Sequence, residues 1–403
     1  MENIGKADKR AARTCRRGGK RVMKIVIFGG SFDPVHAEHV NMVRAAQEAL
    51  SPDKVIVMPA FIPPHKQDRA LASPQDRLNM AKLAFAGIKN CEVSAYELNA
   101  GGTSYTYLTL GYLHGKYPGA QLYFLVGADM LKDFYTWKQP ETILSLAELA
   151  VCNREGDKIG YSAEQLRFFA KFRKKFIGIE YTGRDISSTK ARVLAAFGED
   201  LKPYLPFDVI DYIEANELYR IKGVKGALSY LKPSRRKHTL GVALTAAKYA
   251  AKYRLPERSA ILAAALHDVA KNMPENAPEL SGFTIAEKVP HPVLHQYTGA
   301  YVAEHTLGID DEDVLNAVRY HTSGRPNMSD LEKLIFLSDM LEPSRDFKGI
   351  EKLRRALAED LNECMYISLK HELKHLKKAG GEIYPLTVKA YEYYKKLRKQ
   401  TNG

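Results

Sequence analysis

The feature that most constrains the fold is a short apolar run, KIVIFGG, at Lys24–Gly30. A run without polar alternation that ends in glycines is typical of a strand buried on both faces of a parallel sheet and followed by a loop. Alternation of such runs with helical patterns predicts an α/β doubly wound parallel sheet. Further strand runs lie at 54–58 and 121–127, with helical patterns at 41–50, 75–86 and 105–117.

The pattern changes near residue 220, where a closing helix over 207–219 is followed by a candidate linker at 221–227 that contains two glycines. From there on only helical patterns occur, so we expect an all-α domain over 228–395 and a tail at 396–403. A chain of 403 residues fits two domains, since single cores rarely exceed about 250 residues. The helical patterns lie at 239–253, 257–270, 298–307, 311–320, 330–340 and 389–399.

Residues 1–22 are rich in lysine and arginine and poor in apolar side chains, which predicts a disordered basic extension before a first domain at 23–220. They lack the apolar segment of a secretory signal peptide, and no stretch approaches the roughly 20 apolar residues that span a bilayer. The four cysteines form no Cys-x-x-Cys pair, which fits a reducing cytoplasm.

The formal net charge is +13. Beyond the basic extension, the positive excess suits polyphosphate substrates and requires no nucleic acid to explain it. We expect no membrane partner. Whether the chain forms a homo-oligomer stays open at this stage.

The first candidate site lies in the segment GGSFDPVHAEH. Gly29, Gly30 and Ser31 follow the first strand, where glycines let the backbone approach a phosphate closely. His36 and His39 stand at the entry to the next helix, so both imidazoles could reach one phosphate. A glycine pair after a strand is also common as a plain tight turn, so this segment alone leaves both interpretations open.

The segment resembles the signature of the nucleotidyltransferase superfamily, which implies a Rossmann-like nucleotidyltransferase fold for the parallel sheet. Five further segments narrow the resemblance, over about residues 23–220, to the bacterial nicotinate-nucleotide adenylyltransferases of NAD biosynthesis. The resemblance implies direct transfer of AMP from ATP to nicotinate mononucleotide, with pyrophosphate released and no covalent enzyme intermediate. The segments are PAFIPPHK at 59–66, SYTYLTL at 104–110, FLVGADMLKDFYTW at 124–137, VCNREG at 151–156 and ISSTKAR at 186–192.

The resemblance also implies roles for individual residues. His36 and His39 would be catalytic, holding the ATP phosphates and stabilising charge on the α-phosphate. Mg²⁺ would accompany the triphosphate. Contacts to ATP would come from Gly29, Gly30, Ser31, Gly127, Asp129, Ser188, Thr189 and Arg192, and contacts to nicotinate mononucleotide from Lys66, Tyr105, Thr106, Trp137 and Arg154.

One residue departs from this family, which usually has glycine at the position of Glu38. A carboxylate close to phosphates is unfavourable unless it points to solvent or helps to hold the metal. Arg77, Arg154 and Trp137 also fit a surface ion pair or core packing. Another acceptor, such as phosphopantetheine, is the alternative substrate for this domain, and segments 63–66 and 104–106 argue against it.

The second candidate site centres on His267 and Asp268, which end an apolar helical stripe in SAILAAALHDVAK. A lone His-Asp pair is most often a satisfied polar pair. Apolar surroundings make unpaired charge costly, however, so converging imidazoles and carboxylates would suit one or two divalent cations. Further candidates of this kind are His238, His295, His321 and Asp339.

This ordered set resembles the HD-domain phosphohydrolases over about residues 228–395. The flanking sequence is similar to the bacterial family that splits diadenosine tetraphosphate symmetrically into two ADP. The resemblance implies a first metal held by His238, His267, Asp268 and Asp339, and a second held by His295, His321 and a bridging, catalytic Asp268. In that family the metal is iron, and a metal-activated water attacks a bridging phosphorus.

Lys271, Arg319 and Arg345 are candidate phosphate contacts in this domain, with surface solvation as the equal alternative. Two other functions stay open for the second domain. It could hydrolyse another nucleotide, such as a guanosine alarmone, or it could be a non-catalytic nucleotide sensor that regulates the transferase.

Overall fold

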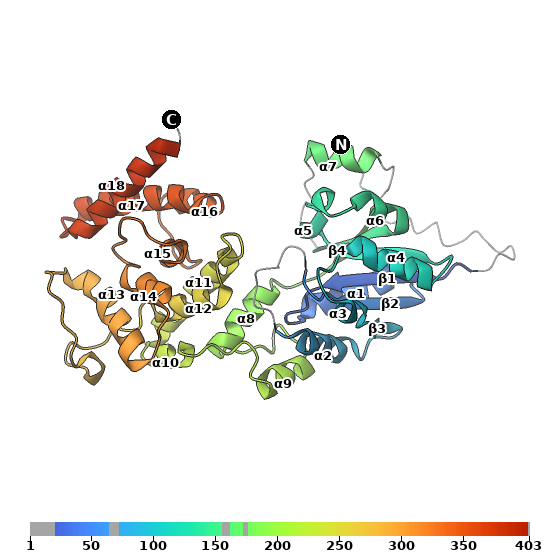
Figure 1. The fold of residues 1–403 in the computed structure, drawn as a ribbon, viewed down its shortest axis with the longest axis horizontal. Coiled ribbons are helices and arrows are strands. Elements are labelled where there is room, and N and C mark those ends of the chain that lie inside the picture. Colours follow the sequence, from blue (N-terminus) through green and yellow to red (C-terminus); the bar gives the residue numbers. More distant parts are fainter. Residues whose placement is uncertain (1–20, 64–71, 132, 155–161, 172–175, 402–403) are drawn as a thin grey trace.

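The computed structural model describes residues 21–63, 72–131, 133–154, 162–171 and 176–401. A sheet with flanking helices comes first, and a group of helices follows it (Figure 1). The predicted fold class, an α/β parallel sheet followed by an all-α domain, is therefore confirmed. No helix among these residues is long and apolar enough to cross a bilayer.

The sheet has six parallel strands in the order β3-β2-β1-β4-β5-β6. The central strand β1 pairs with β2 on one side and with β4 on the other, so the strand order reverses there. In sheets of this kind, ligands bind outside the carboxyl ends of the strands at such a switch point, a region here called the crevice. The strands are β1 (Lys24–Gly30), β2 (Lys54–Pro59), β3 (Cys91–Val93), β4 (Gln121–Gly127), β5 (Glu148–Arg154) and β6 (Ile177–Tyr181).

Alternate residues of β1 fill two separate cores. Val26 and Phe28 pack in one core with residues of α1 and α2, whereas Ile25 and Ile27 pack in another with residues of α4 and α6. Burial on both faces explains why this strand reads as one continuous apolar run. The helices of this half are α1 (Ala37–Leu50), α2 (Pro74–Phe85), α3 (Tyr96–Ala100), α4 (Thr106–Lys116), α5 (Ala128–Leu131), η2 (Phe134–Thr136), α6 (Pro140–Leu146), α7 (Ala163–Lys171), α8 (Ser188–Phe197) and α9 (Phe207–Ala215).

In the second half, helices extend into both segments that were expected to flank the helical domain. The expected linker at 221–227 overlaps α10, because Val224 and Ala227 are fully buried and their packing outweighs the glycines. The expected tail at 396–403 continues α18 as far as Thr401. The elements are α10 (Val224–Ser229), α11 (Pro233–Ala250), α12 (Glu257–Leu266), η3 (Pro278–Leu280), α13 (His291–Tyr301), the π-helical turn η4 (Val302–Thr306), α14 (Glu312–Arg319), α15 (Asp330–Leu341), α16 (Ile350–Leu357), α17 (Leu361–Ala379) and α18 (Pro385–Thr401).

Helix α8 belongs to both halves and lies between them in Figure 1. At its start, the Ser188 hydroxyl donates to the Pro34 carbonyl in the loop after β1, at 3.0 Å. Farther along, Val193 and Phe197 are buried in the same hydrophobic cluster as the helices of the second half. The two halves therefore share a packed helix in addition to the chain that joins them.

This shared packing generates a stability prediction. Phe197→Ala should lower the free energy of unfolding by about 3–5 kcal/mol, because the removed ring leaves a cavity where α8 meets the helical core. Denaturant unfolding followed by circular dichroism would measure the loss. Phe207→Ala is the matched control: Phe207 is 67% exposed, so the same truncation should change stability by no more than about 0.5 kcal/mol. Equal effects of the two substitutions would contradict the assigned role of α8.

Candidate functional site

The crevice at the switch point gathers the glycines expected to contact ATP. Gly29 and Gly30 end β1, and Gly127 ends the neighbouring β4. A Cβ atom at Gly127 would lie 2.5 Å from an oxygen of Asp129, so a side chain there would displace this carboxylate. Asp129 itself is exposed at the start of α5. The structure thus brings these residues to one edge of the sheet.

The two histidines of the first segment lie against each other at the start of α1. Their rings are stacked, with centroids 3.7 Å apart. The His36 backbone N–H donates to Nδ1 of His39 at 3.1 Å. In the neutral His39 ring this bond leaves the proton on Nε2, where it can be donated to a phosphate oxygen. The pair therefore combines imidazole donors with a helix N-terminus, which favours anions.

Helix α8 begins beside this loop, with Ser188 and Thr189 in its first turn. Arg192, one turn later, is 8% exposed, and its guanidinium does not stand free beside the crevice. Nε and Nη2 donate to the two oxygens of Glu257 at 2.6 and 2.7 Å, while Nη1 donates to the Asp33 carbonyl at 2.5 Å. Nη2 also donates to the Thr189 hydroxyl at 3.1 Å. Four of its five N–H groups therefore bind acceptors within the protein, and a contact between this arginine and ATP stays a prediction.

Trp137, expected on the nicotinate side, follows η2 and is half-buried. Its ring meets Phe124 and Phe134 at centroid distances of 6.2 and 5.3 Å. Its Nε1 atom is buried and makes no hydrogen bond within the described part of the chain. Because a buried donor normally finds an acceptor, this N–H is suited to a bound ligand.

The other residues expected on that side are only partly described. Tyr105 caps the start of α4 and lies under the Lys138 ammonium group, 4.2 Å from its ring centroid, and Thr106 is the first residue of that helix. Lys66 lies outside the described residues. Arg154 ends β5, and only its backbone is described.

Glu38, the departure from the expected signature, does not point to solvent. The residue is 2% exposed, and its Oε1 accepts a hydrogen bond from Asn41 at 3.2 Å. Its Oε2 lies where a side chain at position 183 would stand, so the carboxylate fits because residue 183 is glycine. The carboxylate therefore faces the loop after β6, which reduces the conflict with phosphates.

Arg77 has a structural role. The side chain is 1% exposed, and it donates to the carbonyls of Ser31, Ala60 and Phe61 at 3.0, 2.5 and 2.8 Å. These carbonyls belong to the loops after β1 and β2. Arg77 thus holds the two loops that border the crevice.

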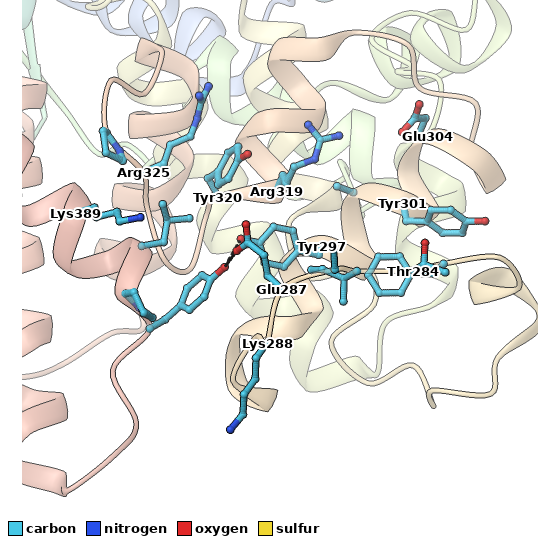
Figure 2. A pocket seen from close by; sticks show the side chains of 18 of the residues that line it. Thr284, Glu287, Lys288, Tyr297, Tyr301, Glu304, Arg319, Tyr320, Arg325 and Lys389 are labelled. Carbon is cyan, nitrogen blue, oxygen red and sulfur yellow. Dashed lines mark hydrogen bonds between the residues drawn. The ribbon is translucent and has the colours of Figure 1, made fainter.

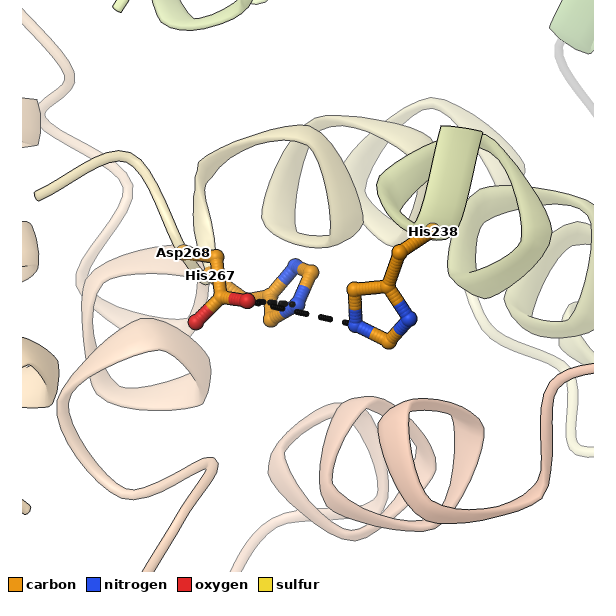
Figure 3. A group of neighbouring side chains, drawn as sticks. All are labelled: His238, His267 and Asp268. Carbon is orange, nitrogen blue, oxygen red and sulfur yellow. Dashed lines mark ion pairs between the residues drawn. The ribbon is translucent and has the colours of Figure 1, made fainter. Parts of the chain in front are cut away.

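In the second half, Asp268 stands at the centre of four imidazoles. Figure 3 shows it with two of them, His238 and His267. Its Oδ2 lies 3.3 Å from Nε2 of His267 and 3.9 Å from Nε2 of His238. Its Oδ1 lies 3.4 Å from Nε2 of His295 and 3.6 Å from Nε2 of His321. Two candidate metal-binding groups therefore share one carboxylate.

Hydrogen bonds behind the cluster orient the imidazoles. His267 and His321 each donate Nδ1–H to the carbonyl three residues earlier, at 2.6 and 2.7 Å. His238 has Nδ1 at 3.1 Å from Glu342 Oε1 and Nε2 at 3.0 Å from Asp339 Oδ1. A proton held on Nδ1 leaves the Nε2 lone pair facing the cluster, as in protein metal sites.

The pKa shifts within the cluster are consistent with these imidazoles and carboxylates as metal ligands. Burial, followed by His321 and Lys271, lowers the pKa of His295 to about 2, so this imidazole is neutral. Burial alone would raise the pKa of Asp268, but the neighbouring imidazoles, with His267 first, hold this pKa well below its usual range. Burial opposes protonation of His267, but Asp268 outweighs it, so the pKa of His267 is raised. Imidazole nitrogens and ionised carboxylates are the ligands that divalent transition metals take, and metal binding displaces an imidazole proton. The residues present therefore fit one or two such ions.

Cationic side chains lie around the cluster. Lys271 Nζ is 2.9 Å from His295 Nε2, and Arg345 Nη2 donates to Asp339 Oδ1 at 2.7 Å. Both had been expected as phosphate contacts. The third expected contact, Arg319, instead pairs with Glu312 at 3.1 Å and makes no described contact with the cluster.

Sequence reasoning missed two residues at this site. Arg235 donates to Asp268 Oδ2 at 2.8 Å, and Glu342 supports His238. Each lies one helical turn from an expected ligand, Arg235 before His238 and Glu342 after Asp339. Spacing of i to i+3 on one helix face was the signal that could have found them.

Arg319 lines a separate cavity of about 780 Å³ with several tyrosines (Figure 2). Tyr297 and Tyr384 contribute their rings, and the Tyr384 hydroxyl donates to Glu287 at 3.1 Å. None of the six cluster residues lines this cavity. The cavity and the cluster are thus distinct features of the helical half.

Comparison with known proteins matches each half to a family. Residues 27–194 match the cytidylyltransferase-like family, and residues 235–344 match the HD domain family. Among solved structures, an HD superfamily hydrolase from Clostridium acetobutylicum, described as involved in NAD metabolism, shares 36% identity at a TM-score of 0.40. That alignment covers 43% of this chain and 95% of that one.

Two relatives extend the comparison. A Mycoplasma genitalium protein named as a probable nicotinate-nucleotide adenylyltransferase/Ap4A hydrolase is 29% identical over 362 residues, which cover 86% of this chain and 97% of that protein. A probable nicotinate-nucleotide adenylyltransferase of Clostridium tetani is 36% identical over 200 residues, which cover 49% of this chain and 99% of that protein. The chain therefore belongs to the nicotinate-nucleotide adenylyltransferase family, in the form that carries an HD domain after the transferase domain.

Proposed function

We propose that this chain is a bifunctional enzyme. Its first activity transfers AMP from ATP to nicotinate mononucleotide, giving nicotinate adenine dinucleotide and pyrophosphate. Its second activity hydrolyses diadenosine tetraphosphate to two ADP. The observation that carries the proposal is that relatives named for both activities align over 86% of this chain, through both candidate sites.

In the transferase, a phosphate oxygen of nicotinate mononucleotide forms a bond to the α-phosphorus of ATP while the bond to the pyrophosphate oxygen breaks. The protein contributes by positioning the reactants and stabilising charge. We assign charge stabilisation to His36 and His39, which stand together at the N-terminus of α1. Ser188 and Thr189, at the start of α8, would bind the phosphates from the opposite side of the loop, with Mg²⁺ accompanying ATP.

On the acceptor side, we propose that the pyridine ring of nicotinate mononucleotide stacks on Trp137. Its half-buried ring offers a stacking surface, and its buried N–H offers a donor that the described residues do not use. Tyr105 and Thr106 at the start of α4 would complete this side, together with Lys66 and Arg154.

For the hydrolase, we propose a divalent transition metal, with iron as the candidate. When bound, it would supply Lewis acidity that activates water and neutralises developing phosphate charge. The chain contributes the imidazoles and carboxylates of His238, His267, Asp268, Asp339, His295 and His321 as ligands. Arg235, Lys271 and Arg345, which lie around this set, would draw the polyphosphate towards it.

A non-catalytic nucleotide sensor is not favoured. All six candidate ligands are present, and they lie close together with imidazoles oriented by hydrogen bonds. The relatives that align over both halves are named as hydrolases as well as transferases.

The direct test of both activities uses the full-length chain with a panel of substrates. ATP would be supplied with nicotinate mononucleotide, nicotinamide mononucleotide and phosphopantetheine, and pyrophosphate release would be measured. Diadenosine tetraphosphate and guanosine alarmones would be supplied separately with divalent metals, and the products identified by chromatography. Turnover of another acceptor in preference to nicotinate mononucleotide would overturn the transferase assignment. Guanosine product without ADP would overturn the hydrolase assignment.

The histidine pair generates a kinetic prediction. His39→Ala should lower kcat for adenylyl transfer by a factor on the order of 100, because charge stabilisation on the α-phosphate is lost while ATP contacts elsewhere remain. Steady-state kinetics with both substrates would measure kcat and KM. His305→Ala, at an exposed histidine of the helical half, is the control and should leave kcat unchanged. A His39 variant with nearly full kcat would show that the role belongs to another residue.

The shared carboxylate generates a second prediction. Asp268→Asn should abolish the hydrolase and lower the bound metal content, because both groups of imidazoles lose their common ligand. Metal analysis and both activity assays would be run on one preparation. Adenylyl transfer should continue with Mg²⁺ alone. The exposed Asp310→Asn is the matched control. Hydrolysis by the metal-depleted Asp268 variant would contradict the ligand assignment.

A further inference from the structure

Helix α12 reaches both candidate sites. It begins at Glu257, whose carboxylate holds Arg192 of the transferase half. It ends at Leu266, directly before His267 and Asp268 of the metal cluster. A helix of this length rises about 1.5 Å per residue, so a single rigid element separates the two sites by roughly 15 Å. The helical half thus supplies a charged group to the phosphate-binding side of the other half.

The Arg192 guanidinium has only one N–H group left that could bind a ligand. An arginine carries five N–H groups, and four of these donate to Glu257, Thr189 and the Asp33 carbonyl. In addition, Oδ2 of the Asp33 carboxylate lies 3.6 Å from Nη1. The bond to Glu257 is bidentate, which fixes both the position and the plane of the guanidinium. The Arg192 side chain therefore links segments of the protein to one another.

Arg192 links the two segments that would bind the phosphates of ATP. Thr189 lies in the first turn of α8. Asp33 lies in the loop between β1 and the histidine pair, and its carboxylate is fully buried. Tyr219 donates to that carboxylate at 2.7 Å, and the backbone N–H of Ala72 donates to it at 3.2 Å. The separation of α8 from this loop therefore depends on the orientation of Arg192.

Burial makes this orientation dependent on Glu257. The side chains of Arg192 and Glu257 are 9% and 13% exposed. A guanidinium that loses its carboxylate partner in such surroundings is a buried charge without full compensation, and it would shift towards other acceptors. Burial opposes the charged form of Arg192, but the hydrogen bonds that the guanidinium donates to Glu257 favour that form, and the pKa of Arg192 is raised.

We propose that Glu257, contributed by the helical domain, is a positioning residue of the adenylyl transfer site. It holds Arg192 so that the start of α8 and the loop after β1 keep the spacing that the ATP phosphates require. This inference rests on the proposed transferase function. The helical domain then completes the transferase in addition to carrying its own metal cluster.

The test compares full-length wild type with Glu257→Gln, which keeps the size of the side chain and removes its charge. We expect kcat/KM for ATP to fall about tenfold or more, with KM for ATP raised and KM for nicotinate mononucleotide unchanged. Glu257→Asp, which keeps the charge, should recover part of the loss. Loss of folded protein alone would lower the apparent kcat and leave both KM values unchanged, so an unaltered KM for ATP would overturn the proposal.

The opposite outcome is also informative. If Glu257 instead withheld Arg192 from ATP, its removal would lower KM for ATP, and this result would overturn the proposal as well. Glu363→Gln is the matched control. Glu363 lies in the first turn of α17 and bonds Arg398 at 2.7 Å within the helical half, so its loss should leave KM for ATP unchanged. Wild-type activity in the same assay tests the proposed function, whereas the ratio of variant to wild type tests this inference.

Discussion

Compensation of buried charge is the constraint on which both halves of this molecule depend. Asp33 and Asp268 are carboxylates with almost no exposed surface, and a buried ion is stable only when hydrogen-bonded and paired. Around Asp33 the compensation comes from Arg192, Tyr219 and backbone, and it fixes the loop that carries the histidine pair. Around Asp268 it comes from imidazoles and Arg235, in an arrangement that suits a cation.

The two sites differ in how they are positioned. The nucleotide crevice follows from the topology of the sheet, because the strand order reverses at β1 and the carboxyl ends of β1 and β4 meet there. The metal cluster follows from helix packing, because its residues come from α11, α13, α15 and the segments just after α12 and α14. Helices α8 and α12 join these two frameworks through one buried ion pair, which is why the halves are not simply neighbours on a chain.

Much of the candidate site could be predicted from the sequence because its residues lie in short segments beside regular elements. The glycines after β1, the histidine pair and the His267–Asp268 pair each sit within one turn or loop of a recognisable apolar pattern. Contacts between distant segments could not be predicted in this way. Arg192 illustrates the limit. The segment around it implied a contact with ATP, whereas two of its nitrogens donate to Glu257, which lies 65 residues later in the chain.

The sequence by itself determined the α/β sheet and the change to helices near residue 220, because hydrophobic period is a property of neighbouring residues. The candidate residues of both sites came from short segments that resemble known families. Only the tertiary structure decided that α10 begins within the expected linker, that Glu38 turns towards Gly183 and that α8 is buried in both halves. These outcomes depend on which surfaces meet after folding. Burial favours apolar contacts and paired charges, however far apart the contacting residues lie along the chain.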